Sequence, residues 1–146
     1  MKLKNETLSK NFLIYGFGKS GSACFDFLNR NNNLLVFDDN FSIKNKKYSN
    51  YFFSPDRIKK IKFDYIFLSP GIDINNCILS KFLKKNKIKI ISELDIFYKT
   101  YPNLNKITIT GTNGKSTTSK LIYEVLKYHK NDVDFESLII KNFFLL

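Results

Sequence analysis

A short apolar run that ends in a glycine-rich turn is the feature that most limits the fold of this chain. Residues Phe12–Tyr15 (FLIY) lead directly into Gly16–Gly21 (GFGKSG), and apolar residues then recur at helical spacing as far as Arg30. A buried parallel strand has such a short, closed run, and glycines permit a tight turn into the following helix. This order predicts the start of an α/β fold with a parallel sheet.

Further apolar runs, each bounded by polar or turn-forming residues, extend the same pattern. We expect strands over 34–37, 65–68 and 88–91, a short strand over 51–53, a helix that starts at Pro55, and helices near 78–86 and 94–98. Strands that alternate with helices favour a parallel sheet. The sequence therefore predicts a Rossmann-like domain over residues 1–92.

A second glycine turn lies further along the chain. A strand expected over 106–110 leads into Thr110–Thr117 (TGTNGKST), and a helix is expected from Ser116 to about Lys130, with an apolar face formed by Leu121, Ile122, Val125 and Leu126. The end of the turn matches a P-loop, although Ile109 stands where the usual first glycine would be. In a P-loop, backbone N–H groups cradle phosphate oxygens, the lysine reaches the β- and γ-phosphates, and the hydroxyl ligates Mg²⁺.

The first glycine turn leaves several interpretations open. Asp38 follows the expected second strand, where a dinucleotide-binding fold places its ribose-binding carboxylate, so an NAD(P) or FAD site is one interpretation. Close packing of strand on helix is another. Residues Ser69–Gly71 end a third strand, at the edge where open α/β sheets bind ligands, but an ordinary strand-exit turn has the same sequence.

Composition narrows the class of protein. The chain has 24 Lys and Arg against 13 Asp and Glu, but its arginines are only Arg30 and Arg57 and its lysines are scattered, which disfavours nucleic-acid binding. We expect Cys24 and Cys77 to be buried, reduced thiols, and His129 cannot form a metal site alone. Neither a signal peptide nor a membrane-spanning run is present, so we expect a cytoplasmic monomer.

Taken together, the motifs resemble those of the Mur ligases. TGTNGKST is similar to the ATP-binding loop of these enzymes and of the related folylpolyglutamate synthases. The synthases carry no glycine-rich α/β domain ahead of this loop, whereas about 105 residues precede it here. The order GFGKSG, LSPGI, SELDIF and then the loop, across residues 10–130, resembles the branch that adds D-glutamate. The branch that adds L-alanine typically has a Gly-Gly doublet in its first turn, which is absent here.

The resemblance implies substrates, cofactors and site residues. The first domain would hold the UDP part of UDP-N-acetylmuramoyl-L-alanine, and the loop would hold ATP and Mg²⁺. The ATP γ-phosphoryl group would pass to the substrate carboxylate, and the D-glutamate amine would then attack the acyl phosphate to form an amide. The implied UDP contacts are Gly18, Lys19, Ser20, Asp38, Asp39, Ser69, Pro70 and Gly71. The implied ATP contacts are Gly111, Thr112, Asn113, Gly114, Lys115, Ser116 and Thr117, with Lys115 catalytic and Ser116 a Mg²⁺ ligand.

The chain departs from the family pattern in two places. Asp39 and Asn40 replace a more usual hydroxyl-plus-basic pair after the second strand. Residues 131–146 lack the glycine turn and the acidic, histidine and lysine groups that the family places after its P-loop helix. We therefore expect 93–146 to be the truncated start of a P-loop ATPase domain with an aberrant tail, as a frameshift or premature stop would leave it. An inactive ligase fragment is the first hypothesis, and a non-catalytic module that binds a UDP-sugar or nucleotide is the alternative.

Overall fold

The computed structural model describes residues 9–40, 46–103, 107 and 109–129. The chain divides into two compact units, Met1–Pro102 and Asn103–Leu146, and each is described separately. Unit 1 has strands and helices in alternation around a parallel sheet, which confirms the predicted α/β class.

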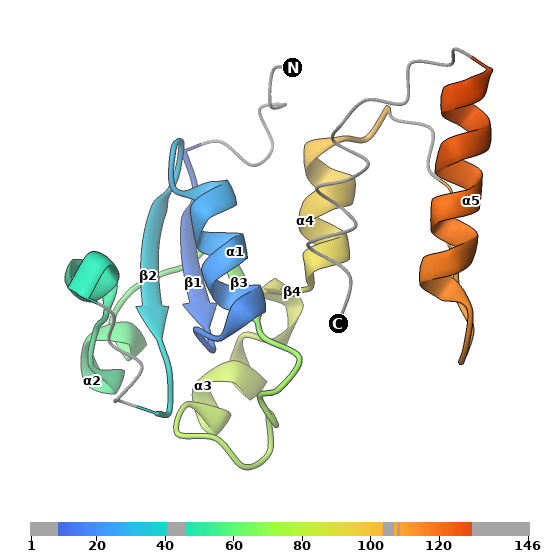
Figure 1. Cartoon of the computed structure of the whole chain (residues 1–146). Coiled ribbons are helices and arrows are strands. Elements are labelled where there is room, and N and C mark those ends of the chain that lie inside the picture. Colours follow the sequence, from blue (N-terminus) through green and yellow to red (C-terminus); the bar gives the residue numbers. More distant parts are fainter. Residues whose placement is uncertain (1–8, 41–45, 104–106, 108, 130–146) are drawn as a thin grey trace. The chain divides into compact units, whose positions relative to one another are not determined.

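Unit 1 is built on four parallel strands in the order β2-β1-β3-β4 (Figure 1). The strands are β1 (Asn11–Tyr15), β2 (Asn33–Phe37), β3 (Tyr65–Leu68) and β4 (Ile90–Ile91). Tyr15 pairs with both Phe37 and Leu68, so the carboxyl ends of the three longest strands meet at one edge of the sheet. Ligands of open α/β sheets bind at this edge.

Helices connect the strands and cover the sheet. They are α1 (Lys19–Leu28), α2 (Pro55–Lys59), α3 (Ser80–Lys85) and α4 (Glu93–Thr100), together with the 3-10 helices η3 (Lys46–Tyr51) and η4 (Lys87–Lys89). One buried cluster joins Leu13 and Ile66 of the sheet to Ile58 of α2 and Leu83 of α3. Helix α1 instead approaches Ile14, whose side chain lies on the opposite face of β1. The sheet is therefore covered on both faces, as its nearly continuous apolar strands require.

Three local predictions about unit 1 were wrong. The strand expected over 51–53 is replaced by the end of η3 and a single parallel bridge between Phe52 and Val36. Ile88, expected in a strand, lies in η4 and is 94% exposed, because the chain needs this turn to pass from α3 into the two-residue β4. Helix α3 begins at Ser80, and Ile78 stays half exposed ahead of it.

The compact units divide after Pro102. Helix α4 is held in unit 1 because Ile96 and Thr100 are buried there, at 1% and 2% exposure. The burial of Cys24 also raises the pKa of its thiol, with Glu93 of α4 adding to the effect. Cys24 is thus the expected buried, reduced thiol, whereas Cys77 is only partly buried.

Unit 2 contains α5 (Lys115–Tyr128), which has no buried residue among those described. Two side chains of its predicted apolar face, Leu121 and Val125, are 62% and 56% exposed. Ile107, Ile109 and Thr110 do not form the expected strand, and Lys106 and Thr108 lie outside the described residues, as does the tail over 131–146. A strand needs a hydrogen-bonded neighbour, and the described part of unit 2 offers none.

Candidate nucleotide-binding site

Three motifs that are distant in sequence meet at the carboxyl edge of the unit 1 sheet. The N–H of Gly16 donates to the carbonyl oxygen of Phe37 at 2.8 Å, and the N–H of Ser69 donates to that of Tyr15 at 2.9 Å. A Cβ atom added to Gly16 would lie 2.6 Å from the Cβ of Ser69. The first glycine turn, the residues after β2 and the Ser69–Gly71 turn therefore form one surface.

The glycines on this surface have two different explanations. Gly16 has a φ of +89°, and a Cβ on Gly21 would overlap the carbonyl oxygen of Gly16, so strand–turn–helix packing requires both. A Cβ on Gly18 or Gly71 would meet no atom within 4 Å, and neither residue has a positive φ. The chain itself gives no reason for glycine at these two positions, and the space beside them is open to a ligand.

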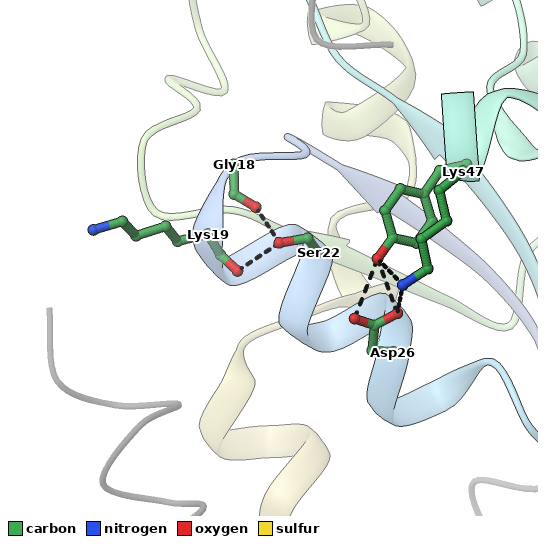
Figure 2. A network of polar contacts seen from close by, with 6 residues as sticks. Gly18, Lys19, Ser22, Asp26 and Lys47 are labelled. Atoms are coloured by element: carbon green, nitrogen blue, oxygen red, sulfur yellow. Dashed lines mark hydrogen bonds and ion pairs between the residues drawn. The ribbon is translucent and has the colours of Figure 1, made fainter. Parts of the chain in front are cut away.

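The start of α1 offers hydrogen-bond donors to an anion. Its N-cap is Gly18, which has no side chain to cap the helix, and its first turn contains no acidic residue. The hydroxyl of Ser22 instead donates to the carbonyl oxygens of Gly18 and Lys19 at 2.9 and 3.1 Å (Figure 2). Uncapped N–H groups and the positive end of the helix dipole favour a phosphate here. Ser20, the second helical residue, is 8% exposed.

Lys19 adds a positive charge at the same helix start. Its exposed side chain extends away from Asp26 and Lys47 (Figure 2), and it has no ion pair among the described residues. Lys47 instead lies 3.7 Å from Asp26 and also donates to the hydroxyl of Tyr48 at 2.8 Å. No sequence motif indicated this network of Asp26, Lys47 and Tyr48, because its members come from separate elements.

The two aspartates after β2 have different surroundings. Asp38 is 8% exposed, and its Oδ2 and Oδ1 accept the N–H groups of Phe17 at 2.6 Å and Asn40 at 2.8 Å. Asp39 is only partly buried, and its Oδ1 accepts the hydroxyl of Tyr15 at 2.5 Å. Both carboxylate oxygens of Asp38 therefore accept backbone hydrogen bonds. Only Oδ1 of Asp39 accepts a hydrogen bond from the described residues.

Tyr15 lies beneath this surface, and the sequence did not reveal its role. Its ring is fully buried, and its hydroxyl lies 3.5 Å from the donating N–H of Leu79, which is 64 positions away. Burial first, and then the hydrogen bond to Asp39, raise the pKa of Tyr15 far above its ordinary value. The phenol therefore stays protonated and donates to Asp39. An aromatic hydroxyl at the last position of a buried strand was the only available signal.

The second glycine turn belongs to unit 2, and each of residues 111–117 is exposed. Gly111 and Gly114 have φ values of +151° and +75°, which favour glycine, and Gly114 is the N-cap of α5. The ammonium group of Lys115 folds back and donates to the carbonyl oxygens of Gly111 and Thr112. Ser116 and Thr117 follow in the first helical turn. Such a turn can present N–H groups, a lysine and a hydroxyl to phosphate oxygens.

Within the described residues, no three His, Cys, Asp or Glu side chains lie close enough to hold a metal ion. None of the helices in that same part of the chain has the length and apolar character to cross a bilayer. His129 is exposed and follows the last residue of α5.

Sequence comparison identifies several relatives that share one name. No protein-family model matches the chain. It is 35% identical over 131 residues to the UDP-N-acetylmuramoylalanine–D-glutamate ligase of Rickettsia bellii, a match that covers 86% of the chain and 28% of the relative. The ligases of the same name from Caldicellulosiruptor bescii and Francisella philomiragia are each 32% identical, over 136 and 143 residues. The match covers 85% and 94% of the chain but only 29% and 30% of these relatives, so the chain spans under a third of their length.

Proposed function

We propose that this chain, which corresponds in sequence to the N-terminal part of the UDP-N-acetylmuramoylalanine–D-glutamate ligases, binds the UDP end of UDP-N-acetylmuramoyl-L-alanine in unit 1. The open space beside Gly18 and Gly71, next to the uncapped start of α1, is the observation on which the proposal rests. A diphosphate there would meet backbone N–H groups and the ammonium group of Lys19. Ser20, Ser69 and Pro70 belong to the same surface.

Isothermal titration of the full chain with UDP tests this proposal. A Cβ atom added at Gly18 has no other atom within 4 Å, so we expect Gly18→Val to fold, and we expect its branched side chain to occupy the open space and to weaken UDP binding by at least about tenfold. Ser54→Val, at the N-cap of the separate helix α2, is the control. No UDP binding by the wild-type chain, or equal binding by Gly18→Val, would overturn the proposal.

We propose that the exposed turn of unit 2, Gly111–Thr117, holds the phosphates of ATP. Lys115 would exchange the carbonyl oxygens of Gly111 and Thr112 for the β- and γ-phosphates and would stabilise the charge that develops during phosphoryl transfer. The hydroxyl of Ser116 is the protein group available to Mg²⁺, which supplies charge neutralisation when it is bound. Lys115→Ala should remove MgATP binding and leave UDP binding unchanged. Loss of both, or of neither, would contradict this assignment.

The reaction of the lineage, as we propose it, is ATP-dependent amide ligation in peptidoglycan biosynthesis. ATP phosphorylates the carboxylate of UDP-N-acetylmuramoyl-L-alanine, the amine of D-glutamate displaces phosphate from the acyl phosphate, and ADP and phosphate are released. We also propose a cytoplasmic monomer, because the proposed UDP surface is formed by residues of a single chain.

We propose that the 146-residue chain does not catalyse the ligation by itself. A P-loop helix functions against a sheet, and α5 has no buried residue and no strand beside it in the described part of unit 2. Phosphate release that required the UDP substrate, D-glutamate and ATP together would overturn this.

A non-catalytic nucleotide-binding module is the second candidate. The core and the best-formed ligand surface both belong to unit 1, which favours binding without chemistry. UDP-sugar binding without ATP hydrolysis under any condition would support it. An NAD-binding module is less well supported, because both oxygens of Asp38 already accept backbone N–H groups. Titration with NADH, followed by its fluorescence, separates the NAD and UDP hypotheses.

A further inference from the structure

A dense group of cationic side chains lies on unit 1, away from the glycine turn. Residues 57–62 lead into the amino end of β3, and residues 84–89 lead into the amino end of β4. Neither segment contains an acidic residue, and together they carry eight cations: Arg57, Lys59, Lys60, Lys62, Lys84, Lys85, Lys87 and Lys89. The proposed UDP site lies at the carboxyl ends of the strands, so this group is separate from it.

Tertiary packing brings the two cationic segments together. The ammonium group of Lys89 donates to the carbonyl oxygen of Phe63 at 2.7 Å, across 26 positions of the sequence. The rings of Phe63 and Phe82 lie in edge contact, with centroids 6.3 Å apart. Apolar residues of both segments also share one buried cluster. The eight cations and Ile88, which lies among them, are called the lysine-rich surface below.

The charges of the lysine-rich surface are little neutralised by the chain itself. All but one of its eight cationic residues are exposed, and the other is partly buried. Among the described residues, its one ion pair joins Lys59 to Asp56, at 3.6 Å and open to solvent. Asp64, the other acidic neighbour, accepts a backbone N–H group at 2.9 Å. Helix dipoles favour cations in the last turns of α2 and α3, but they do not account for Lys62 and Lys87, which lie beyond those helices.

Ile88 distinguishes between the anionic partners that such a surface could bind. It stands between Lys87 and Lys89 and is 94% exposed, more than any other large apolar residue in the described part of the chain. A single exposed isoleucine is ordinary, but one flanked by lysines suits a boundary between anionic headgroups and acyl chains. Nucleic-acid phosphates would leave Ile88 in water. The single arginine of the surface, Arg57, lies over the ring of Phe53 at 4.2 Å, which also favours lipid over nucleic acid.

We propose that the lysine-rich surface binds the headgroups of an anionic lipid bilayer, with Ile88 entering the boundary just below them. Groups of four to eight cations at a membrane surface attract anionic lipids, and an apolar side chain adds a contact that salt does not screen. The contact is peripheral, and it leaves the carboxyl edge of the sheet open to a ligand. The proposal does not depend on UDP or ATP binding.

Cosedimentation of the full chain with lipid vesicles tests the proposal. We expect binding to vesicles of phosphatidylcholine mixed with phosphatidylglycerol, and at least about tenfold weaker binding to phosphatidylcholine alone. Raising the salt from about 50 to about 500 mM should weaken binding to the anionic vesicles, because the lysines are exposed to screening.

Two double variants locate the contact. Lys62→Glu with Lys87→Glu reverses one exposed charge in each segment, and we expect at least about tenfold weaker binding to the anionic vesicles. Lys120→Glu with Lys127→Glu makes the same change of net charge at exposed positions of α5. This control should bind within about threefold of the wild type. Far-UV circular dichroism verifies that both variants are folded.

Ile88→Ser keeps every charge and changes a side chain that the fold does not bury. We expect it to weaken binding to the anionic vesicles about fivefold, because the apolar contact is lost. The loss should persist at high salt, which separates the apolar contribution from the electrostatic one.

Three results would overturn the proposal. One is equal binding to neutral and anionic vesicles, or no binding to either. Another is an equal loss in the two double variants, because net charge or α5 would then explain the binding. The third is wild-type vesicle binding by Ile88→Ser together with tighter binding of the wild type to single-stranded RNA, which would identify a nucleic-acid surface. UDP titration is a separate measurement, so none of these results bears on the proposed function.

Discussion

The two glycine turns of this chain have similar local sequences and very different surroundings. Each precedes a helix, and positive φ values occur at Gly16 in the first turn and at Gly111 and Gly114 in the second. Gly16 and Gly21 of the first turn are buried where three strands end, although Gly18 and Lys19 are exposed, whereas every residue of Gly111–Thr117 is exposed. In the first turn, close neighbouring atoms explain which positions require glycine. In the second turn, only the positive φ values explain the glycines. A shared motif therefore does not imply a shared reason for its residues.

The largest expected effect separates the two kinds of glycine in the first turn. Gly21→Ala would drive a Cβ into the backbone of Gly16, and we expect the free energy of unfolding to fall by about 4 kcal/mol. Gly18→Ala meets no neighbouring atom but puts alanine at the N-cap of α1, so it should lower the free energy of unfolding by no more than about 1 kcal/mol. Urea unfolding followed by far-UV circular dichroism measures both. Equal losses would show that Gly18 is also a packing residue.

A matched pair of leucines compares the two units directly. Leu83 of α3 is fully buried, and Leu83→Ala should lower the free energy of unfolding by about 3 kcal/mol. Leu121 of α5 is 62% exposed, and Leu121→Ala should cost less than about 0.5 kcal/mol. The same unfolding experiment applies. A large effect at Leu121 would mean that α5 is covered in solution, which would remove the contrast between the units.

The start of α4 provides a smaller, pH-dependent test of a helix that is capped, unlike α1 and α5. The Ser92 side chain accepts the N–H of Asp95, and Asp95 accepts the N–H of Ser92 at 2.8 Å. Ser92→Ala should cost about 1 kcal/mol. Ser54, at the start of α2, makes no capping hydrogen bond, so Ser54→Ala should have little effect.

The backbone and side-chain hydrogen bonds from Ser92 lower the pKa of Asp95 below its ordinary 3.8. A lowered pKa in the folded state contributes stability above pH 3.8, and that contribution is lost as the pH falls through the folded value. The difference in stability between wild type and Asp95→Asn should therefore be constant near neutrality and shrink below about pH 4. A difference that did not shrink in acid would contradict the capping role of the charged form.

The smallest effect is expected for the polar network beside the first glycine turn. Asp26 and Lys47 lie 3.7 Å apart with side chains 56% and 67% exposed, and exposed pairs are strongly screened by solvent. Asp26→Asn should leave the Tm within about 1 °C of the wild type in a thermal scan. A clearly lower Tm would show that this network stabilises α1.

The sequence predicted those parts of the fold that depend on local pattern. The strand over 65–68 has the expected bounds, β1 and β2 begin one residue earlier than expected, and Pro55 starts α2. These features follow from runs of apolar residues and from turn chemistry within a few positions. The local pattern predicted strands at Ile88 and over 51–53, and both predictions were wrong. In both places an apolar run lies where the chain turns between elements.

For the candidate site, the sequence by itself determined the two glycine turns, the lysine and hydroxyls of the second turn, and the presence of two aspartates after β2. Only the tertiary structure decided which of those residues the chain uses for itself. The bond from Phe17 to Asp38 spans 21 positions, and that from Tyr15 to Asp39 spans 24. Such contacts depend on strand order and on the directions in which side chains leave the sheet, and neither is encoded in neighbouring residues.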